Sequence, residues 1–169
     1  MRYFLFSLAT RWGRSEGGIN VFNKDLISAI ADSMSTEAKC ICLTKSGSDV
    51  SDKKDVEVVQ YRHFDSPLET AEQIRDLIQR DASSQITQII ILGHDVHTGG
   101  LAINTCHELR KLVRFDTKSA IVRHMHYHQY AQYKGTPPPE AILRAEKQTR
   151  LVEEADNRRN TSLGGTSPR

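Results

Sequence analysis

The chain has 169 residues, the size of one ordinary domain, and its 38% hydrophobic and 26% charged residues are typical of a soluble protein with a core. A formal net charge of +2 is too close to zero for a protein that coats nucleic acid or lies on a membrane surface. The apolar run in "MRYFLFSLATRWGR" is too short to span a membrane and lacks a signal-peptide cleavage site. We therefore expect a cytoplasmic protein with no nucleic-acid partner and no integral membrane segment.

Five short runs rich in β-branched, aliphatic and aromatic residues predict strands. In chain order they are RYFLFSL (2–8), AKCICLT (38–44), VEVVQY (56–61), ITQIIIL (86–92) and SAIVRHMHY (119–127). Between these runs, apolar residues recur at helical spacing. The positions concerned are Ile19, Phe22, Leu26 and Ile30, then Ala71, Ile74 and Ile78, and then Ala102, Cys106, Leu109 and Val113. Strands and helices thus alternate along the chain.

The second and fourth helices have the clearest boundaries. Ser66, Pro67 and Glu69 fit the N-cap, the first-turn proline and the reaching-back glutamate of a capping box. The fourth helix is expected to begin after "KGTPPPE", with Thr136 as a cap, and to end near Ala155.

This alternation predicts an α/β protein of three layers, with a mostly parallel central sheet and helices on both faces. The apolar run "IIIL" supports it, because a strand covered on both faces has no polar side. Ligands of such open sheets bind outside the carboxyl ends of the strands. The candidate segments are therefore those that follow the strands, namely "ATRWGRSEGG", "KSGSD", "RHFDS", "GHDVHTGG" and "HYHQYAQYKG".

The three cysteines, Cys40, Cys42 and Cys106, do not form a recognisable ligand set. Strand alternation directs Cys40 and Cys42 to the same face, and their spacing fits neither a disulfide framework nor a zinc site of the CxxC type. We expect them to be buried, reduced thiols.

Five of the seven histidines fall at or just beyond predicted strand ends. They are His94, His97, His124, His126 and His128. Alternation along the last strand would place the final three on one face, which together with Asp95 suggests a transition-metal site. Hydrogen bonds to the backbone at strand ends would explain any single one of them equally well. No HExxH motif or pair of CxxC motifs accompanies them, so a functional cleft is favoured and a metal site stays as an alternative.

Three segments together resemble the N-terminal half of the family 4 glycosyltransferases. They are "EGGINVFNKDLISAIA", "IIILGHD" and "AIVRHMHYHQYAQYKG", and the resemblance runs from about residue 2 to "EEAD" at 153–156. Members of that family are retaining enzymes of the GT-B fold, in which two Rossmann-like domains face each other across a cleft. The resemblance implies transfer of a sugar from a nucleotide-sugar donor to an acceptor hydroxyl, with no cofactor and no metal ion.

The resemblance also implies roles for individual residues. Gly17 and Gly18 match the first-loop glycines, which let the backbone amides and the helix N-terminus approach the diphosphate of the donor. A plain linker is the alternative for this glycine pair. His126 matches the histidine that lies beside the reacting sugar and bonds a donor hydroxyl, and His124 is a competing match for the same position.

The acceptor side of the cleft is implied by further matches. His94 and Asp95 match a strand-end motif that lines it. Tyr127, Tyr130 and Lys134 are expected to add acceptor contacts, although packing against the rim of the domain is an alternative for the tyrosines.

The sequence departs from the family pattern at its end. The family continues with a second Rossmann-like domain that binds the nucleotide, whereas "NRRNTSLGGTSPR" is polar and lacks strand periodicity. We therefore expect one acceptor-side domain at 1–156, a disordered tail at 157–169, and little or no transfer unless a separate donor domain is supplied. A truncated or frameshifted gene, or a natural single-domain form, would explain this. The alternative function is a non-catalytic module that binds a sugar or phosphate, or that self-associates as a homo-oligomer.

Overall fold

The computed structural model describes residues 2–13, 17–34, 36–45, 56–81, 86–124, 135 and 137–161. Its strands are β1 (Arg2–Leu8), β2 (Ala38–Thr44), β3 (Val56–Gln60), β4 (Ile86–His94) and β5 (Asp116–Val122). Its helices are α1 (Gly18–Ser33), α2 (Pro67–Arg80), α3 (Asp95–Leu112) and α5 (Pro138–Thr161). The chain divides into two compact units, Met1–Val122 and Arg123–Arg169, and the sheet lies in the first of them.

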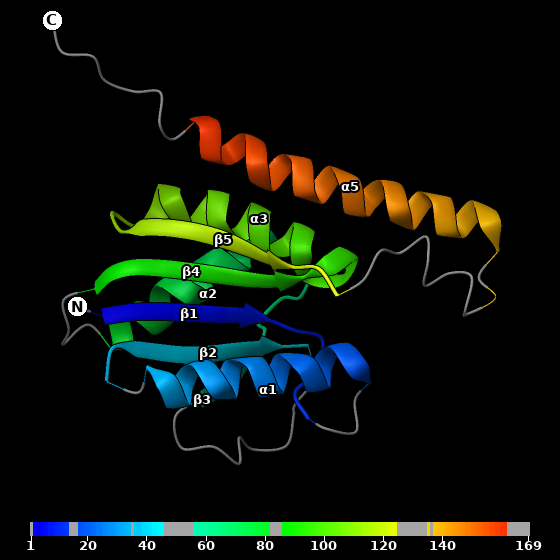
Figure 1. Ribbon diagram of the computed structural model, residues 1–169. Coiled ribbons are helices and arrows are strands. Elements are labelled where there is room, and N and C mark those ends of the chain that lie inside the picture. Colours follow the sequence, from blue (N-terminus) through cyan, green and yellow to red (C-terminus); the bar gives the residue numbers. More distant parts are fainter. Residues whose placement is uncertain are drawn as a thin grey trace, which may run out of the picture. The chain divides into compact units, whose positions relative to one another are not determined.

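The five strands form one sheet in the order β3-β2-β1-β4-β5, and each neighbouring pair is parallel (Figure 1). The chain moves outward from β1 to β2 and β3, then crosses back to β4 on the other side of β1. The strand order therefore reverses between β1 and β4, and the carboxyl ends of these two strands mark the place where open α/β sheets bind ligands.

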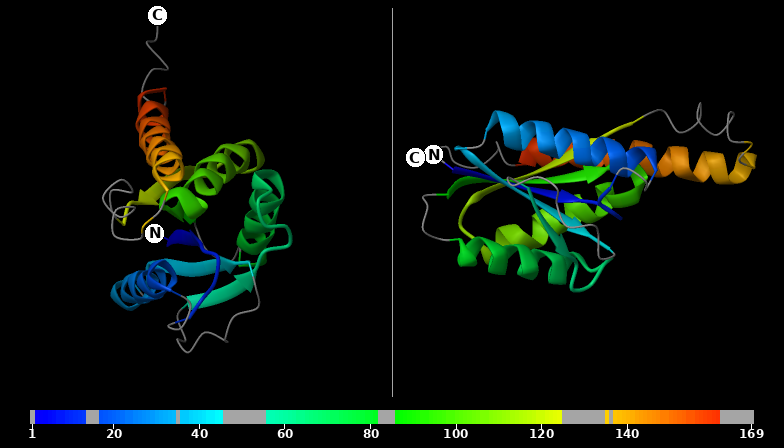
Figure 2. Two further views of the ribbon diagram at one scale, coloured as in Figure 1. Left: turned by 90° about the vertical axis from the view of Figure 1, so that its right-hand side faces the viewer. Right: turned by 90° about the horizontal axis from the view of Figure 1, so that it is seen from below.

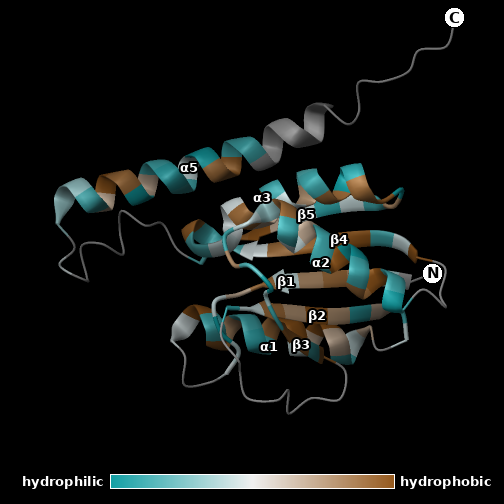
Figure 3. Cartoon of the chain, turned by 180° about the vertical axis from the view of Figure 1, so that it is seen from behind, coloured by the Kyte–Doolittle hydropathy of each residue, from teal (hydrophilic) through white to brown (hydrophobic). Residues whose placement is uncertain are grey.

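Helix α1 covers one face of this sheet, and α2 and α3 cover the other (Figure 2). Strand β1 supplies both faces, because Phe4, Phe6 and Leu8 belong to the cluster under α2 and α3, whereas Leu5 belongs to the cluster under α1. The central strands are accordingly mostly hydrophobic, and the helices carry hydrophilic stretches (Figure 3). The three-layer α/β architecture with a parallel sheet is confirmed.

Several local predictions are also confirmed. Ser66 is the N-cap of α2, its hydroxyl accepts a hydrogen bond of 3.4 Å from the amide of Glu69, and Pro67 is the first helical residue. All three cysteines are free and buried. Cys40 and Cys42 share the cluster under α1, as strand alternation requires.

Two strand boundaries differ from the prediction. Strand β4 continues to His94 and α3 begins at Asp95, so most of "GHDVHTGG" is helical rather than a connecting loop. Strand β5 runs over Asp116–Val122, not 119–127, and Val122 pairs with His94, the last residue of β4. Beyond this pair β4 offers no further backbone partner, so strand alternation does not extend to His124.

Helix α1 buries a different face from the one predicted. Its buried residues are Asn20, Asn23, Ile27, Ser28 and Ala31. Phe22, which was assigned to the core, is 44% exposed. The side chains of Asn20 and Asn23 find partners inside the protein, whereas Leu26 and Ile30 are only partly buried, so apolar periodicity alone placed the buried face about one residue away from its true position.

Helix α5 runs to Thr161, past the end expected near Ala155. The extra residues, "DNRRNT", contain neither glycine nor proline, so no backbone constraint ends the helix near Ala155.

Candidate functional site

The glycine pair lies where the sequence placed it, at the start of α1 just beyond the carboxyl end of β1. Gly17 is the N-cap and has φ +88°, a conformation that residues with a side chain rarely adopt. Both glycines are exposed, and a Cβ added to either one would meet no atom of the described residues within 4 Å. The backbone is therefore open to approach at the positive end of a 16-residue helix.

Asn20 fastens the loop that precedes this helix. Its carboxamide oxygen accepts hydrogen bonds from the hydroxyl of Thr10, at 3.1 Å, and from the amide of Arg11, at 3.3 Å. The next loop residue, Trp12, is only 2% exposed and packs into the cluster under α1. Lys24 places its ammonium 5.9 Å from the centre of the Trp12 ring. The loop therefore follows the first turns of α1 closely.

A buried polar cluster lies one turn further along the same helix. The carboxamide oxygen of Asn23 accepts a hydrogen bond of 2.5 Å from the hydroxyl of Ser7 on β1 and lies 2.6 Å from Nε2 of His94 on β4. Because this oxygen is an acceptor only, the imidazole of His94 donates from Nε2. The amide group of Asn23 lies 3.5 Å from the sulfur of Cys42 on β2. One helix side chain thus joins the ends of three adjacent strands.

The backbone of His94 is held as firmly as its ring. Its amide donates a hydrogen bond of 2.8 Å to the hydroxyl of Thr98, and that hydroxyl donates one of 2.7 Å to the carbonyl of Leu8. The following residue, Asp95, has φ +44°, which is uncommon for a residue with a side chain. Strained backbone of this kind persists only where the surroundings enforce it, and it gathers at functional sites.

The structure places the residues singled out at the predicted strand ends at different depths. His94 is 1% exposed and Asp95 is 6% exposed, so both lie beneath the surface at the edge of the sheet. His97 is exposed on the first turn of α3, and His124 is half-buried just beyond β5. His126, Tyr127, Tyr130 and Lys134 lie outside the described residues.

Two other chemistries can be assessed at this edge. Burial raises the pKa of Cys42 to about 12, against the smaller opposing effect of its hydrogen bonds with Asn23 and Ser7. The thiol is therefore protonated at neutral pH and is no nucleophile. Within the described ranges, no group of three or more His, Cys, Asp or Glu side chains is arranged to hold a metal ion.

Sequence reasoning missed the residues that build this edge from inside, namely Ser7, Asn20, Asn23 and Thr98. A usable signal was present in α1, because Asn20 and Asn23 are three residues apart and asparagine is a poor helix former. Ser7 and Thr98 carry no comparable signal, since single hydroxyl residues are common in strands and helices.

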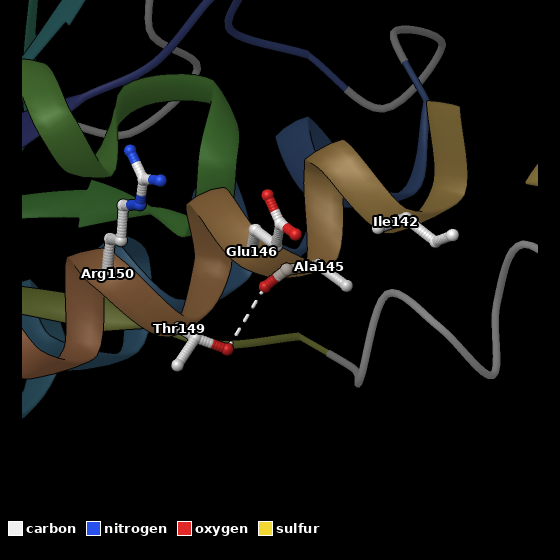
Figure 4. A pocket seen from close by; sticks show the side chains of 5 residues that line it. All are labelled: Ile142, Ala145, Glu146, Thr149 and Arg150. Atoms are coloured by element: carbon white, nitrogen blue, oxygen red, sulfur yellow. Dashed lines mark hydrogen bonds between the residues drawn. The ribbon is translucent and has the colours of Figure 1, made fainter. Parts of the chain in front are cut away.

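A surface pocket of about 360 Å³ lies elsewhere, on α5 (Figure 4). It is lined by Ile142, Ala145, Glu146, Thr149 and Arg150. The hydroxyl of Thr149 donates back to the carbonyl of Ala145, at 3.1 Å, which is an internal contact of the helix. The pocket brings together no set of groups suited to catalysis.

The reversal of strand order, the open helix N-terminus after β1 and the strained turn after β4 define an α/β domain of the Rossmann-like class. A sequence profile described as "Family 4 Glycosyltransferase in conflict systems" matches residues 6–158, and the chain belongs to this family. A search of curated proteins and a search of solved structures returned no match. No helix in the described part of the chain has the length and apolar character that crossing a bilayer requires.

Proposed function

We propose that this chain is the acceptor-side domain of a GT-B glycosyltransferase, which moves a sugar from a nucleotide-sugar donor to an acceptor hydroxyl. The observation that carries the proposal is the family match over residues 6–158, which includes both the glycine turn and the strained turn beyond β4. Members of this family are described as belonging to conflict systems, which supports a role for this transfer in biological conflict.

The diphosphate of the donor would bind at Gly17 and Gly18. A helix N-terminus carries a partial positive charge and amide donors, and two residues without side chains let phosphate oxygens approach them. This stabilises the leaving diphosphate as negative charge develops on it, and such electrostatic stabilisation is a large part of catalysis in group transfer.

The acceptor would lie towards the turn of His94 and Asp95. His126 is the proposed catalytic residue beside the reacting sugar, with His124 as the alternative. Tyr127, Tyr130 and Lys134 would complete the acceptor contacts. All of these roles are inferred from the family resemblance. No metal ion takes part in this proposal, because amides, hydroxyl binders and cations suffice to hold both substrates in place.

A second Rossmann-like domain is part of the same proposal. In the described part of the first unit the strands form one five-stranded sheet, and we propose that its ligand-binding edge is one wall of a two-domain cleft. We propose that the opposite wall, which binds the nucleotide, is a second, donor-binding domain and that the acceptor-side domain by itself supports little or no transfer. The cytoplasm is the proposed location, since nucleotide sugars are donors there.

The test titrates nucleotide sugars into the purified chain, alone and with a supplied C-terminal donor domain of the family, and follows release of nucleoside diphosphate and mass increase of the acceptor. Transfer that needs both domains supports the proposal. Robust turnover by the chain alone would contradict the need for a second domain. Ligand binding without transfer in either case would favour the non-catalytic module, and activity that depends on added zinc would favour a histidine metal site.

A further inference from the structure

We propose that Asn23 is a positioning residue, which holds the glycine turn at the start of α1 in a fixed place relative to the turn of His94 and Asp95. This inference rests on the proposed function, in which the first turn binds the donor diphosphate and the second lies on the acceptor side. Asn23 touches neither substrate in this proposal; it acts through the backbone that it anchors.

The burial and hydrogen bonding of Asn23 indicate that this side chain does more than fill space in the core. The side chain is 0% exposed, and its oxygen has one partner on β1 and another on β4, at 2.5 and 2.6 Å. Burying a carboxamide in a core is costly unless its bonds are satisfied, and asparagine also disfavours the helix interior. An apolar side chain would fill this position at lower cost if only packing were needed.

Asn23 is close enough to the start of α1 for its hydrogen bonds to restrain the position of the glycine turn. It lies five residues after Gly18, which at about 1.5 Å per residue is roughly 7.5 Å from the helix start. Asn20 lies on the same side, one turn closer to the helix start, and holds Thr10 and the amide of Arg11. The helix N-terminus therefore cannot shift along the sheet without breaking the bonds of one asparagine or the other.

The carboxamide oxygen of Asn23 also restrains the turn of His94 and Asp95. The imidazole of His94 lies against the oxygen of Asn23, while Thr98 holds the backbone amide of His94. Asp95 follows directly, with its positive φ. Loss of the Asn23 oxygen therefore removes one of the hydrogen bonds that hold this strained turn in place.

The test compares Asn23→Ala with Ser28→Ala in the full chain. Ser28 is 6% exposed on the same helix, and its hydroxyl has no hydrogen-bond partner among the residues whose placement is described, so the control removes a buried polar atom without breaking a bond that the structure shows. Ser7→Ala, which removes one of the two bonds to the same oxygen, is the milder variant if Asn23→Ala does not fold.

Two measurements read out positioning without requiring transfer. Amide hydrogen exchange reports the two turns directly, at residues 18–21 and 94–98. The fluorescence of Trp12 reports the first loop, because Trp12 is the single tryptophan of the chain and is buried there. Titration with UDP and with GDP, followed by this fluorescence and repeated with the donor domain present, gives the diphosphate affinity.

We expect Asn23→Ala to exchange at least about tenfold faster at both turns and to bind the diphosphate about tenfold more weakly, because a small displacement of positioning groups has large effects. Ser28→Ala should match the wild type. Exchange that is unchanged at either turn, or raised equally throughout the first unit, would overturn the proposal. If the wild type binds no nucleoside diphosphate even with the donor domain, the proposed function fails, and the exchange comparison still decides the role of Asn23.

Discussion

The hydroxyl of Thr98, on the first turn of α3, donates a hydrogen bond of 2.7 Å to the carbonyl of Leu8, the last residue of β1. The same hydroxyl accepts one of 2.8 Å from the amide of His94. A single oxygen atom thus links the last residue of β1 to the last residue of β4, at the point where the strand order reverses. The geometry of this edge depends on buried polar contacts as much as on the apolar core.

Replacing Thr98 by Val should destabilise the protein. The side chain is 1% exposed, and valine keeps the shape but leaves a buried amide and a buried carbonyl without their partner. We expect the free energy of unfolding to fall by roughly 2–4 kcal/mol, measured by urea unfolding. The control is Thr149→Val, at an exposed position of α5, which should change stability by about 0.5 kcal/mol or less. Equal effects of the two variants would contradict the importance of the Leu8 and His94 contacts.

Gly93 should not tolerate alanine. A Cβ at this position would lie 2.6 Å from the carbonyl oxygen of Thr98, 2.7 Å from the Cβ of Ala102 and 2.9 Å from the Cα of Gly99. Backbone atoms cannot move aside cheaply, so α3 would be pushed away from β4 at a cost of roughly 1–3 kcal/mol. The midpoint of thermal unfolding checks this, and a Gly93→Ala protein as stable as the wild type would refute the close packing of α3 on β4.

Alanine substitutions at Gly17 and Gly18 should have different effects on protein stability, but both should weaken binding of the nucleoside diphosphate. Gly17→Ala forces a side chain into φ +88°, which should cost roughly 1–3 kcal/mol. Gly18→Ala meets open space and has no unusual φ, so the unfolding midpoint should stay the same or rise slightly.

Both glycine variants should weaken binding of UDP or GDP in the presence of the donor domain, because each adds a methyl group beside the amides that would hold the diphosphate. Titration by Trp12 fluorescence measures this. Undiminished binding by both variants would favour the linker interpretation of the glycine pair.

The stability of the protein should fall as pH rises through the alkaline range. Burial raises the pKa of Cys40 to about 11 and that of Cys42 to about 12, from an ordinary 9.0. Burial also raises the pKa of Tyr61 well above its usual 10.0. Above about pH 9 the unfolded thiols lose protons that the folded thiols keep, so the stabilisation is complete below pH 9 and is lost between about 9 and 12.

Urea unfolding at about pH 8 and about pH 10 measures this loss. The control is a Cys40→Ala, Cys42→Ala double variant, in which the difference between the two pH values should be smaller. An identical pH dependence in both proteins would show that the two thiols do not contribute. The intact protein should also react slowly with thiol reagents at pH 8 until it is unfolded, because all three cysteines are buried.

The sequence by itself determined the features that depend on local patterns. Apolar runs and helical spacing were enough for the parallel α/β class, and the order Ser66, Pro67 and Glu69 was enough to locate the start of α2. The glycine pair was placed correctly at the start of α1, where Gly17 adopts a positive φ that glycine accommodates without steric cost. The family resemblance of the chain was likewise present in its motifs.

Only the tertiary structure decided which groups lie on the edge and which lie beneath it. The sequence places His94 at a strand end, but only the fold shows that its ring is bonded to Asn23, which is 71 residues away along the chain. Helix α1 likewise buries the polar Asn23 and leaves Phe22 44% exposed. Buried polar groups must find partners, and those partners are supplied by strands that are neighbours only in the folded sheet. Periodicity describes how one element meets a core, whereas a hydrogen-bonded cluster depends on several elements at once.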